Sequence, residues 1–456
     1  MARLNQPNTM RAVVTHEGGR AFPHLKPIEQ LRRSVASCLL WEDEFYEDGQ
    51  AIADRIFKTA LEVSPADLAA LAIEAREQFN LRHGPLLLLH ALVQTAKGTP
   101  LAGDTIARVI QRADELTEFL AIYWRDGKKP LAKQVKRGLG VAFGKFDEYR
   151  LAKYDRDGAI KLRDVLFLIH AKPKDEAQAD LWKRLVENKL FIPDTWETEL
   201  SAGKDKRETF ERLIREGKLG YLALLRNLRN MEQAGCDAAL VRDAIIARKG
   251  GANRVLPFRY TAAARAAPQF EPAIDQALSE AISEMPALPG LTAVMVDVSG
   301  SMYQAKLSAK SDLLRVDAAA TLASIIHGNI RLFAFADNVT ELPPRRGMAG
   351  VDAIRRVPQG GTRLFDAVAA VNQAVKYDRI IVITDEQATG PGVNFGNTNW
   401  NRIHGHLSSL PAPNPGAKGY MINVASAKNG VGYGPWTHID GFSESVLRFI
   451  GEHERG

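Results

Sequence analysis

Residues 291–302 read LTAVMVDVSGSM, and this stretch decides the fold of the C-terminal part of the chain. Leu291–Val296 is a short, continuous apolar run, which is typical of a strand buried on both faces in a parallel sheet. Asp297, Ser299 and Ser301 follow directly at its end. Because ligands bind beyond the carboxyl ends of the strands in such sheets, we expect a binding site here.

Strands and helices alternate downstream of this run. Apolar patterns predict further strands over Ile330–Ala336, Arg379–Thr384 and Gly419–Val424, and helices over Lys310–His327, Thr362–Val375, Trp400–Leu410 and Glu444–Gly451. This alternation predicts a doubly wound α/β domain with helices on both faces of its sheet. We place the domain at residues 286–456, where the linker Glu284–Gly290 leads into it.

The chain upstream of that linker is predicted to be all-α. Apolar residues recur at helical spacing in Ala51–Leu61, Pro65–Phe79, Leu101–Arg112, Leu131–Phe143, Phe210–Glu216 and Leu219–Gln233. Ser64 before Pro65 is a typical helix start, since serine caps the helix and proline suits its first turn. Short helices joined by short turns predict a helical-repeat domain over residues 1–285. No strict period is visible, so we expect degenerate repeats.

Length and composition indicate a multidomain protein in a reducing compartment. The 456 residues exceed the roughly 250–300 residues of a single hydrophobic core. The net charge of +6 favours a polyanionic partner only modestly. Cys38 and Cys236 lie far apart, which argues against a disulfide framework or a zinc cluster. No apolar run reaches the roughly 20 residues of a membrane span, and the N-terminal residues lack the apolar core of a secretory signal, so we expect a cytoplasmic protein.

Three loops supply oxygen ligands at matching positions of the predicted sheet. The first carries Asp297, Ser299 and Ser301, the second places Thr362 before a helix, and the third places Asp385 after a strand. Hydroxyl and carboxylate oxygens suit a hard divalent cation, Mg²⁺ first, with Mn²⁺ or Ca²⁺ as alternatives. Taken alone, the Asp-x-Ser-x-Ser stretch could also be a turn that holds its own loop together.

The same residues argue against an enzyme. Two-metal hydrolysis needs several acids clustered around both ions, which hydroxyl-dominated ligation of one ion does not provide. No Ser/His/Asp arrangement, P-loop or Gly-x-Gly-x-x-Gly after a strand stands out in the sequence either. We therefore predict a binding function.

Two basic stretches of the helical region are candidates for phosphate contacts. Lys133, Lys136 and Arg137 lie at positions i, i+3 and i+4, so they project from one helix face. The second stretch contains Lys153, His170 and Lys172. Cations on adjacent helices suit an RNA backbone, with Tyr154 and His170 available for stacking. The alternatives are a plain solvated surface for the lysines and a helix-end role for the histidine.

The metal loops resemble the metal-ion-dependent adhesion site of von Willebrand A domains, in which an Asp-x-Ser-x-Ser stretch, a threonine and an aspartate follow in this order. The resemblance implies that Ser299, Ser301 and Thr362 bind the ion directly, whereas Asp297 and Asp385 hold it mainly through water. It also implies an open coordination position for an acidic side chain of a protein partner.

Several stretches resemble signature segments of the Ro autoantigen (TROVE-domain) family: Leu222–Met231, Arg254–Tyr260 and Ile169–Pro173. The resemblance implies HEAT-like helix pairs that close into a ring at a von Willebrand A domain. It implies that small structured (Y-like) non-coding RNA binds outside the ring and that single-stranded ends of misfolded RNA enter its central hole. Lys153 and His170 match the family's outer-surface RNA contacts, whereas Lys133, Lys136, Arg137 and Lys172 are added from charge geometry.

The resemblance also indicates partners and rival functions. Bacterial members act beside exoribonucleases in RNA maturation and decay, so an exoribonuclease is an expected partner of a monomeric chain. A first rival is a protein-interaction module that recruits an acidic partner through its metal and has no RNA role. A second rival is an accessory subunit of an ATP-driven machine such as a chelatase, and the all-helical first half argues against it.

Overall fold

The computed structural model describes residues 26–36, 49–79, 81–155, 158–255, 257–283, 287–304, 306, 313–389, 409–425, 430–441, 450–451 and 453–454. The predicted helices Trp400–Leu410 and Glu444–Gly451 lie almost entirely outside these residues, as does Cys38.

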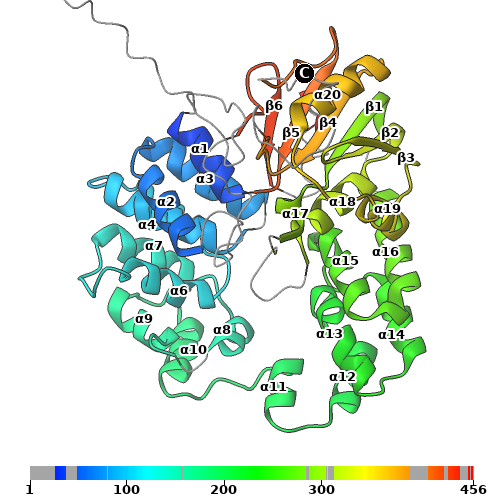
Figure 1. Cartoon of the computed structure of the whole chain (residues 1–456). Helices are drawn as coiled ribbons and strands as arrows, with labels where there is room; N and C mark the ends of the chain where they lie inside the picture. Colours follow the sequence, from blue (N-terminus) through cyan, green and yellow to red (C-terminus); the bar gives the residue numbers. More distant parts are fainter. Residues whose placement is uncertain are drawn as a thin grey trace, which may run out of the picture.

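The first helices form an arm with its own hydrophobic core (Figure 1). They are α1 (Pro27–Ala36), α2 (Gly49–Ala60), α3 (Pro65–Glu77), α4 (His83–Thr95), α5 (Leu101–Val109), α6 (Asp114–Tyr123), α7 (Lys133–Phe143), α8 (Glu148–Tyr154), α9 (Leu162–Ile169) and α10 (Glu176–Val186). The predicted start of α3 is confirmed, because the Ser64 hydroxyl accepts a hydrogen bond from the backbone N–H of Asp67 at 3.2 Å.

A buried ion pair ties three helices of this first arm together. The Arg76 guanidinium on α3 lies 2.8 Å from the Glu115 carboxylate on α6, and it also donates to the carbonyl of Val109 at the end of α5. Glu115 in turn accepts backbone N–H bonds from Gln111 and Arg112, at the start of its own helix. The charged groups of Arg76 and Glu115 therefore find their hydrogen-bond partners inside the arm.

A second arm follows after α11 (Trp196–Ser201). It contains α12 (Lys206–Arg215), α13 (Tyr221–Gln233), α14 (Ala238–Ala247), α15 (Pro257–Ala266) and α16 (Glu271–Ser283), with 3-10 turns at Ala252–Arg254 and Pro268–Phe270. Its apolar residues form one continuous core with one face of the C-terminal sheet. The second arm and the α/β domain are thus packed as one body.

The C-terminal sheet is six-stranded in the described residues, with the order β3-β2-β1-β4-β5-β6. Its strands are β1 (Leu288–Asp297), β2 (Gly328–Phe335), β3 (Val339–Leu342), β4 (Arg379–Thr384), β5 (Lys418–Asn423) and β6 (Thr437–Asp440), and its helices are α17 (Gly300–Gln304), α18 (Arg315–Ile325), α19 (Gly347–Arg355) and α20 (Leu364–Ala374). All neighbouring strands pair in parallel except β2 and β3.

β1 is buried on both faces, as its apolar run predicts. Val294 and Val296 belong to the core shared with the second arm and with α18 and α19, whereas Ala293 and Met295 belong to the core beneath α20. The strand therefore lies between two helical layers, and its carboxyl end at Asp297 is held from both sides.

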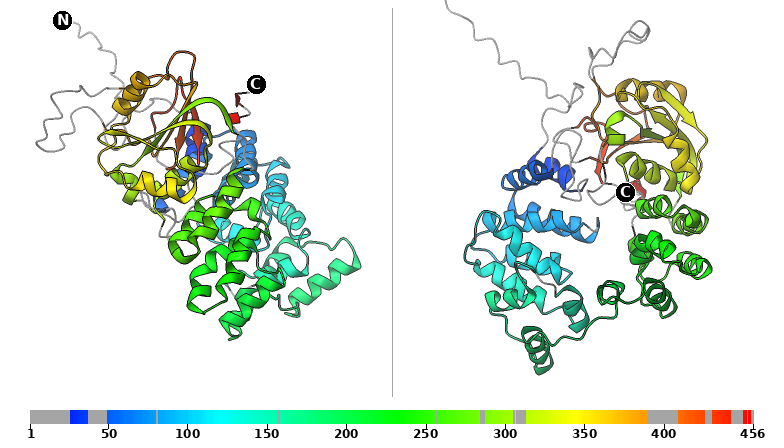
Figure 2. Two further views of the ribbon diagram at one scale, coloured as in Figure 1. Left: turned by 90° about the vertical axis from the view of Figure 1, so that its right-hand side faces the viewer. Right: turned by 60° about the horizontal axis from the view of Figure 1, so that its bottom comes forward.

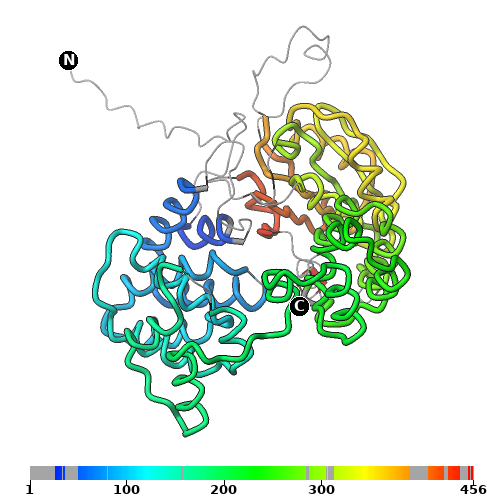
Figure 3. Tube along the Cα trace, turned by 90° about the horizontal axis from the view of Figure 1, so that it is seen from below, coloured from blue at the N-terminus to red at the C-terminus, as the bar shows by residue number. Residues whose placement is uncertain are grey.

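The two arms and the α/β domain are arranged along a closed path. The arms are joined by the segment that carries α11 and run apart around a central opening in the ribbon (Figures 1 and 2). At the other end α1 contacts β6, so the first described helix meets the last strand (Figure 3). The predicted fold class, an all-α ring followed by a doubly wound α/β domain, is confirmed.

No helix among the described residues has both the length and the apolar character that a bilayer crossing requires.

Candidate metal centre and nucleic-acid interface

The first predicted metal loop is a tight turn at the carboxyl end of β1. The backbone N–H of Ser299 donates to Asp297 Oδ1 at 2.8 Å, and the hydroxyls of Ser299 and Ser301 lie 3.2 Å apart. Both serines and the aspartate are buried. The turn thereby gathers two hydroxyl oxygens and one carboxylate at a single point.

Hydrogen bonds tie the three predicted loops to one another. The Gly300 N–H donates to the Gly360 carbonyl at 3.0 Å, which joins the first loop to the second. The Thr384 hydroxyl donates to Asp297 Oδ2 at 2.5 Å, which joins the first to the third. The Thr362 N–H donates to the Thr389 hydroxyl at 3.1 Å, which joins the second to the third. The structure thus assembles the loops that carry all five predicted ligands.

The electrostatics of this site favour a cation. Burial raises the pKa of the Asp297 carboxyl well above its usual range, and the negative charge of Asp385 raises it further. Two buried carboxylates that disfavour each other's charge are relieved when a divalent ion binds between them. In the described part of the chain, no three or more His, Cys, Asp or Glu side chains are arranged so that they could hold a metal ion, so an ion here would depend on hydroxyl ligands.

A buried acid–imidazole–acid group lies directly behind this site. Glu386, which follows Asp385, contacts the His438 imidazole through one carboxylate oxygen, and its other oxygen accepts the N–H groups of Val431 and Gly432 at 2.6 and 2.8 Å. On the far side, His438 Nδ1 lies 3.5 Å from Asp440. This arrangement could not be predicted from the sequence, because β6, which carries His438 and Asp440, is a strand of only four residues.

The predicted cations of α7 have different surroundings. Lys133 is exposed and Lys136 half-buried, and neither is paired with a carboxylate of the described residues. Arg137 instead pairs with Asp104 on α5 at 2.7 Å. Its charge is therefore balanced within the protein, whereas those of the two lysines are available to a ligand.

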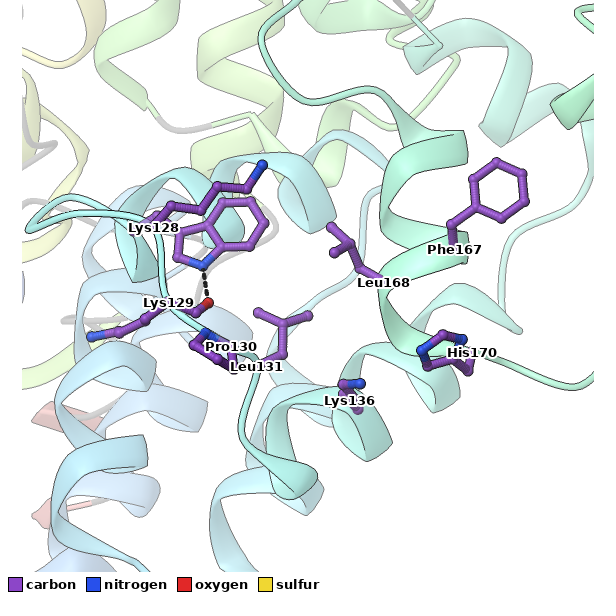
Figure 4. A pocket seen from close by; sticks show the side chains of 9 residues that line it. Lys128, Lys129, Pro130, Leu131, Lys136, Phe167, Leu168 and His170 are labelled. Atoms are coloured by element: carbon purple, nitrogen blue, oxygen red, sulfur yellow. Dashed lines mark hydrogen bonds between the residues drawn. The ribbon is translucent and has the colours of Figure 1, made fainter.

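Lys136 and His170 come together in a cavity of about 500 Å³, which we name the aromatic–basic pocket (Figure 4). It is lined by residues of the α6–α7 segment and of α9: Trp124, Lys128, Lys129, Pro130, Leu131, Lys136, Phe167, Leu168 and His170. In Figure 4, Lys128 and Lys129 lie on one side, Phe167 and His170 on the other, with Leu131 and Leu168 between them. The lining contains no carboxylate.

Aromatic rings, and not acids, support the lysines of this pocket. Lys128 Nζ lies 5.3 Å from the centre of the Trp124 ring, and Lys129 Nζ lies 4.8 Å from that of Tyr123. The Trp124 N–H donates to the Lys129 carbonyl at 2.7 Å and so fixes the segment between α6 and α7. Cation–π contacts leave the lysine charges uncompensated, so the pocket remains attractive to an anion.

His170 ends α9 in the left-handed region, with φ of 52°. Histidine is one of the few residues other than glycine that adopt this conformation at moderate cost, and the turn exposes its side chain at the pocket. Lys172 follows two residues later and is exposed. The chain after α9 thus contributes two of the predicted RNA contacts.

Lys153 and Tyr154 lie outside the pocket, at the end of α8. Lys153 Nζ is 6.0 and 5.8 Å from the ring centres of Tyr149 and Tyr154. The Arg112 guanidinium lies 4.8 Å from the centre of the Tyr154 ring, so a cation already covers this tyrosine. The structure therefore does not place Lys153 in one pocket with His170.

Trp124 and Phe167 were not predicted as site residues. Phe167 lies in the apolar stretch Val165–Ile169, which reads as core, but its side chain is 57% exposed. The helical spacing of Leu162, Val165, Leu166 and Ile169, all buried, places position 167 on the opposite face of α9. That spacing is the signal that could have identified it.

The fold defines a class of protein: a ring of helix pairs whose ends meet at an α/β domain, with hydroxyl-rich loops at the carboxyl ends of its strands. A family model described as "TROVE domain" matches residues 183–271, from the end of α10 to the first residue of α16. The structure is similar to the crystal structure of the Deinococcus radiodurans Ro (RSR) protein, with a TM-score of 0.55 and 17% identity, over 91% of this chain and 96% of that one. The chain thus contains a segment similar to the TROVE domain and has the fold of a Ro protein.

Two curated proteins are similar to a short segment of the chain. The chain is 48% identical over 50 residues to telomerase protein component 1 of Mus musculus and 46% identical over 50 residues to that of Rattus norvegicus. These segments are 11% of this chain and 2% of the relatives, so the chain covers only a small part of their length.

Proposed function

We propose that this chain is a non-enzymatic RNA-binding protein of the Ro type. The aromatic–basic pocket is the observation that carries the proposal, because it combines three lysines and a histidine with the exposed ring of Phe167, the half-buried ring of Trp124 and no acid. Such a surface suits a phosphate backbone and its bases better than an acidic or apolar protein surface. Lys133 and Lys172, both exposed on elements that contribute to the pocket, extend the positive surface.

The Ro fold favours a more specific RNA-binding function, which has two parts. A small structured, Y-like RNA would bind through Lys133, Lys136, Lys153, His170 and Lys172. Single-stranded ends of misfolded RNA would enter the ring, and the protein would act in RNA maturation or quality control beside an exoribonuclease in the cytoplasm. Recognition of phosphates and shape would contribute most of the affinity.

Natively purified protein is expected to carry a discrete small RNA, visible as a raised absorbance ratio and identified by sequencing. Lys153→Gln and His170→Gln should each lower its yield and weaken rebinding in a gel shift about threefold to tenfold, because each removes a contact to the RNA. The matched control is Lys204→Gln, whose lysine pairs with Glu199 at 2.6 Å outside both basic stretches. Protein that binds neither structured nor single-stranded RNA at low salt would contradict the proposal.

We propose that the three-loop site holds one Mg²⁺, with Mn²⁺ or Ca²⁺ as alternatives. Ser299, Ser301 and Thr362 would supply direct oxygen ligands, and Asp297 and Asp385 would balance the charge behind them. The bound ion would supply an electrophilic position for an acidic side chain of a protein partner. Since hydroxyl ligands add no negative charge, the ion would keep a strong attraction for such a carboxylate.

Mg²⁺ is expected to raise the midpoint of thermal unfolding, because an ion that binds only the folded state stabilises it. At about 100 times the dissociation constant the gain is roughly 2.7 kcal/mol, or about 5–10 °C for a domain of this size. Ser299→Ala should abolish the response, as should EDTA. Ser324→Ala, at a buried serine of α18 that donates to the Ala320 carbonyl, is the matched control and should respond like the wild type.

The rival function, a metal-dependent protein-interaction module without an RNA role, makes a separable prediction. Capture of an acidic partner would then be abolished by EDTA and left intact by RNase. Capture abolished by RNase and left intact by EDTA would instead favour the RNA-binding function.

A further inference from the structure

We propose that Glu386 couples the three-loop site to the closure of the ring, because its backbone is bonded to the metal loops and its side chain holds β6, the strand that α1 contacts. The proposal rests on the metal site proposed above and states what occupation of that site does to the rest of the molecule. When the site is occupied, the contact between α1 and β6 should open less often.

The backbone of Glu386 belongs to the loops that carry the proposed ligands. The Glu386 N–H donates to the Thr384 hydroxyl at 2.9 Å, and that hydroxyl donates to Asp297 Oδ2 at 2.5 Å. The residue before it, Asp385, is itself a proposed ligand. A rearrangement of Asp297 or Asp385 around an ion therefore reaches the backbone of Glu386 through one hydrogen bond or one peptide bond.

Glu386 is held in an unfavourable conformation, with φ of 58°. The other described residues besides glycine with positive φ are His170, Asn188 and Arg248, and each follows a helix, where a left-handed residue is common. Glu386 instead follows a strand, and such a conformation persists only where the surrounding contacts hold it. Backbone of this kind is typical of switch regions, because a small change in its contacts alters its position.

The contacts that hold Glu386 are those that position β6. One carboxylate oxygen contacts His438 on β6, and the other accepts the N–H groups of Val431 and Gly432 at 2.6 and 2.8 Å. The side chain of Glu386 is fully buried. β6 has four residues and, among the described strands, pairs only with β5. Because so short a ladder contributes few hydrogen bonds, the position of β6 depends on this carboxylate as well.

β6 is the edge of the sheet at which the ring closes, since α1 contacts it there (Figures 1 and 3). Leu31 and Val35 of α1 belong to the core of the first arm, whereas Ile439 of β6 belongs to the core that the second arm shares with the sheet. The contact thus joins two bodies with separate cores. A change in the position or rigidity of β6 should alter how often this contact opens.

Hydrogen–deuterium exchange of the full-length protein, with saturating Mg²⁺ and with EDTA, tests the coupling. Mg²⁺ should slow exchange in the loop at residues 297–302 and, by about fivefold or more, in α1 and β6, because exchange reports local opening and couplings between sites are typically 5–150-fold. α7, in the middle of the first arm, should exchange at the same rate in both conditions. Calorimetry with Mg²⁺ shows independently whether the ion binds.

His438→Gln should separate the two ends of the link. The variant should still bind Mg²⁺ and protect the loop at residues 297–302, but α1 should no longer respond to the ion. A merely structural role of the imidazole would speed exchange of α1 equally with and without Mg²⁺ and would leave their ratio unchanged. His327→Gln is the matched control, since His327 is a half-buried histidine just before β2, at the amino ends of the strands, and this variant should respond like wild type.

Glu386→Gln tests the same link from the loop side and decides the matter if His438→Gln does not fold, as circular dichroism would show. The amide keeps an oxygen for the N–H groups of Val431 and Gly432, so the segment before β6 should stay in place. The charged contact with His438 is lost, and with it the response of α1 to Mg²⁺.

The outcomes distinguish the coupling from the metal site. If calorimetry shows no Mg²⁺ binding and no loop is protected, the proposed metal site itself is wrong. If Mg²⁺ binds and protects the loop while α1 exchanges as in EDTA, the site stands and the coupling is overturned. A response of α1 that survives in both His438→Gln and Glu386→Gln would likewise overturn the assignment to Glu386.

Discussion

Arg76→Met is expected to destabilise the first arm by about 3–5 kcal/mol, the largest single effect that the structure predicts. The substitution leaves the Glu115 carboxylate, whose side chain is 1% exposed, without its cation. Burial already raises the pKa of Glu115 above its ordinary value, so its charge is costly even with Arg76 in place. The variant also loses the donors to the carbonyls of Val109 and Leu81.

Thermal unfolding of the full-length protein measures this effect, at about 2–4 °C for each kcal/mol. Arg108→Met is the matched control, since Arg108 on α5 makes a two-contact pair with Glu77 on α3, also between helices of the first arm but on the surface. It should shift the midpoint little. The double variant Arg76→Met/Glu115→Gln should recover part of the loss, because no charge then stays buried. A midpoint of Arg76→Met equal to that of Arg108→Met would contradict a structural role for the buried pair.

Stability of the α/β domain is expected to fall as the pH rises from about 6.5 to about 9. Burial opposes the charge of His438, but the carboxylates of Glu386 and Asp440 outweigh it and raise the pKa of the imidazole from 6.5 to about 9. Because the folded-state pKa lies above the unfolded one, the contribution is complete below about pH 6.5 and is lost as the pH rises through 9. It amounts to roughly 3 kcal/mol, at about 1.4 kcal/mol for each pKa unit.

Urea unfolding at a series of pH values measures the slope. His438→Gln should be less stable than wild type at pH 6 and should approach it at pH 9, because its side chain carries no proton to lose. Glu386 would still accept the N–H groups of Val431 and Gly432 in that variant, so the loop that it anchors should remain in place. If the unfolding free energies of wild type and His438→Gln changed with pH in parallel, the pH dependence would not come from the His438 imidazole.

The sequence predicted the fold where its pattern was strong and local. Leu291–Val296 and Arg379–Thr384 are continuous apolar runs, and both are central strands of the sheet. The edge strands β3 and β6 were missed because each has only four residues and one of them is antiparallel. Closure of the ring rests on the contact between α1 and β6, which no local pattern encodes.

The two candidate sites also differ in how far the sequence alone could predict them. The meeting of the three loops that carry the candidate metal ligands could be predicted, because the carboxyl ends of parallel strands lie at one edge of a sheet and so bring Asp297 and Asp385 close together. The aromatic–basic pocket depends on how α9 packs beside α6 and α7. Its cations were visible as charges in the sequence. Phe167 was hidden in an apolar stretch, because exposure is a property of the packed helix and not of the residue.

The contact between α1 and β6 has a consequence for the order in which the protein is made. It joins α1, which ends at residue 36, to β6, which begins at residue 437, so the ribosome must synthesise nearly the whole chain before the closing partner of α1 exists. The first arm has a core of its own, and domains fold as units from the N-terminus during synthesis. The nascent protein is therefore expected to pass through an open, C-shaped stage in which the first arm is complete and the ring has not yet closed.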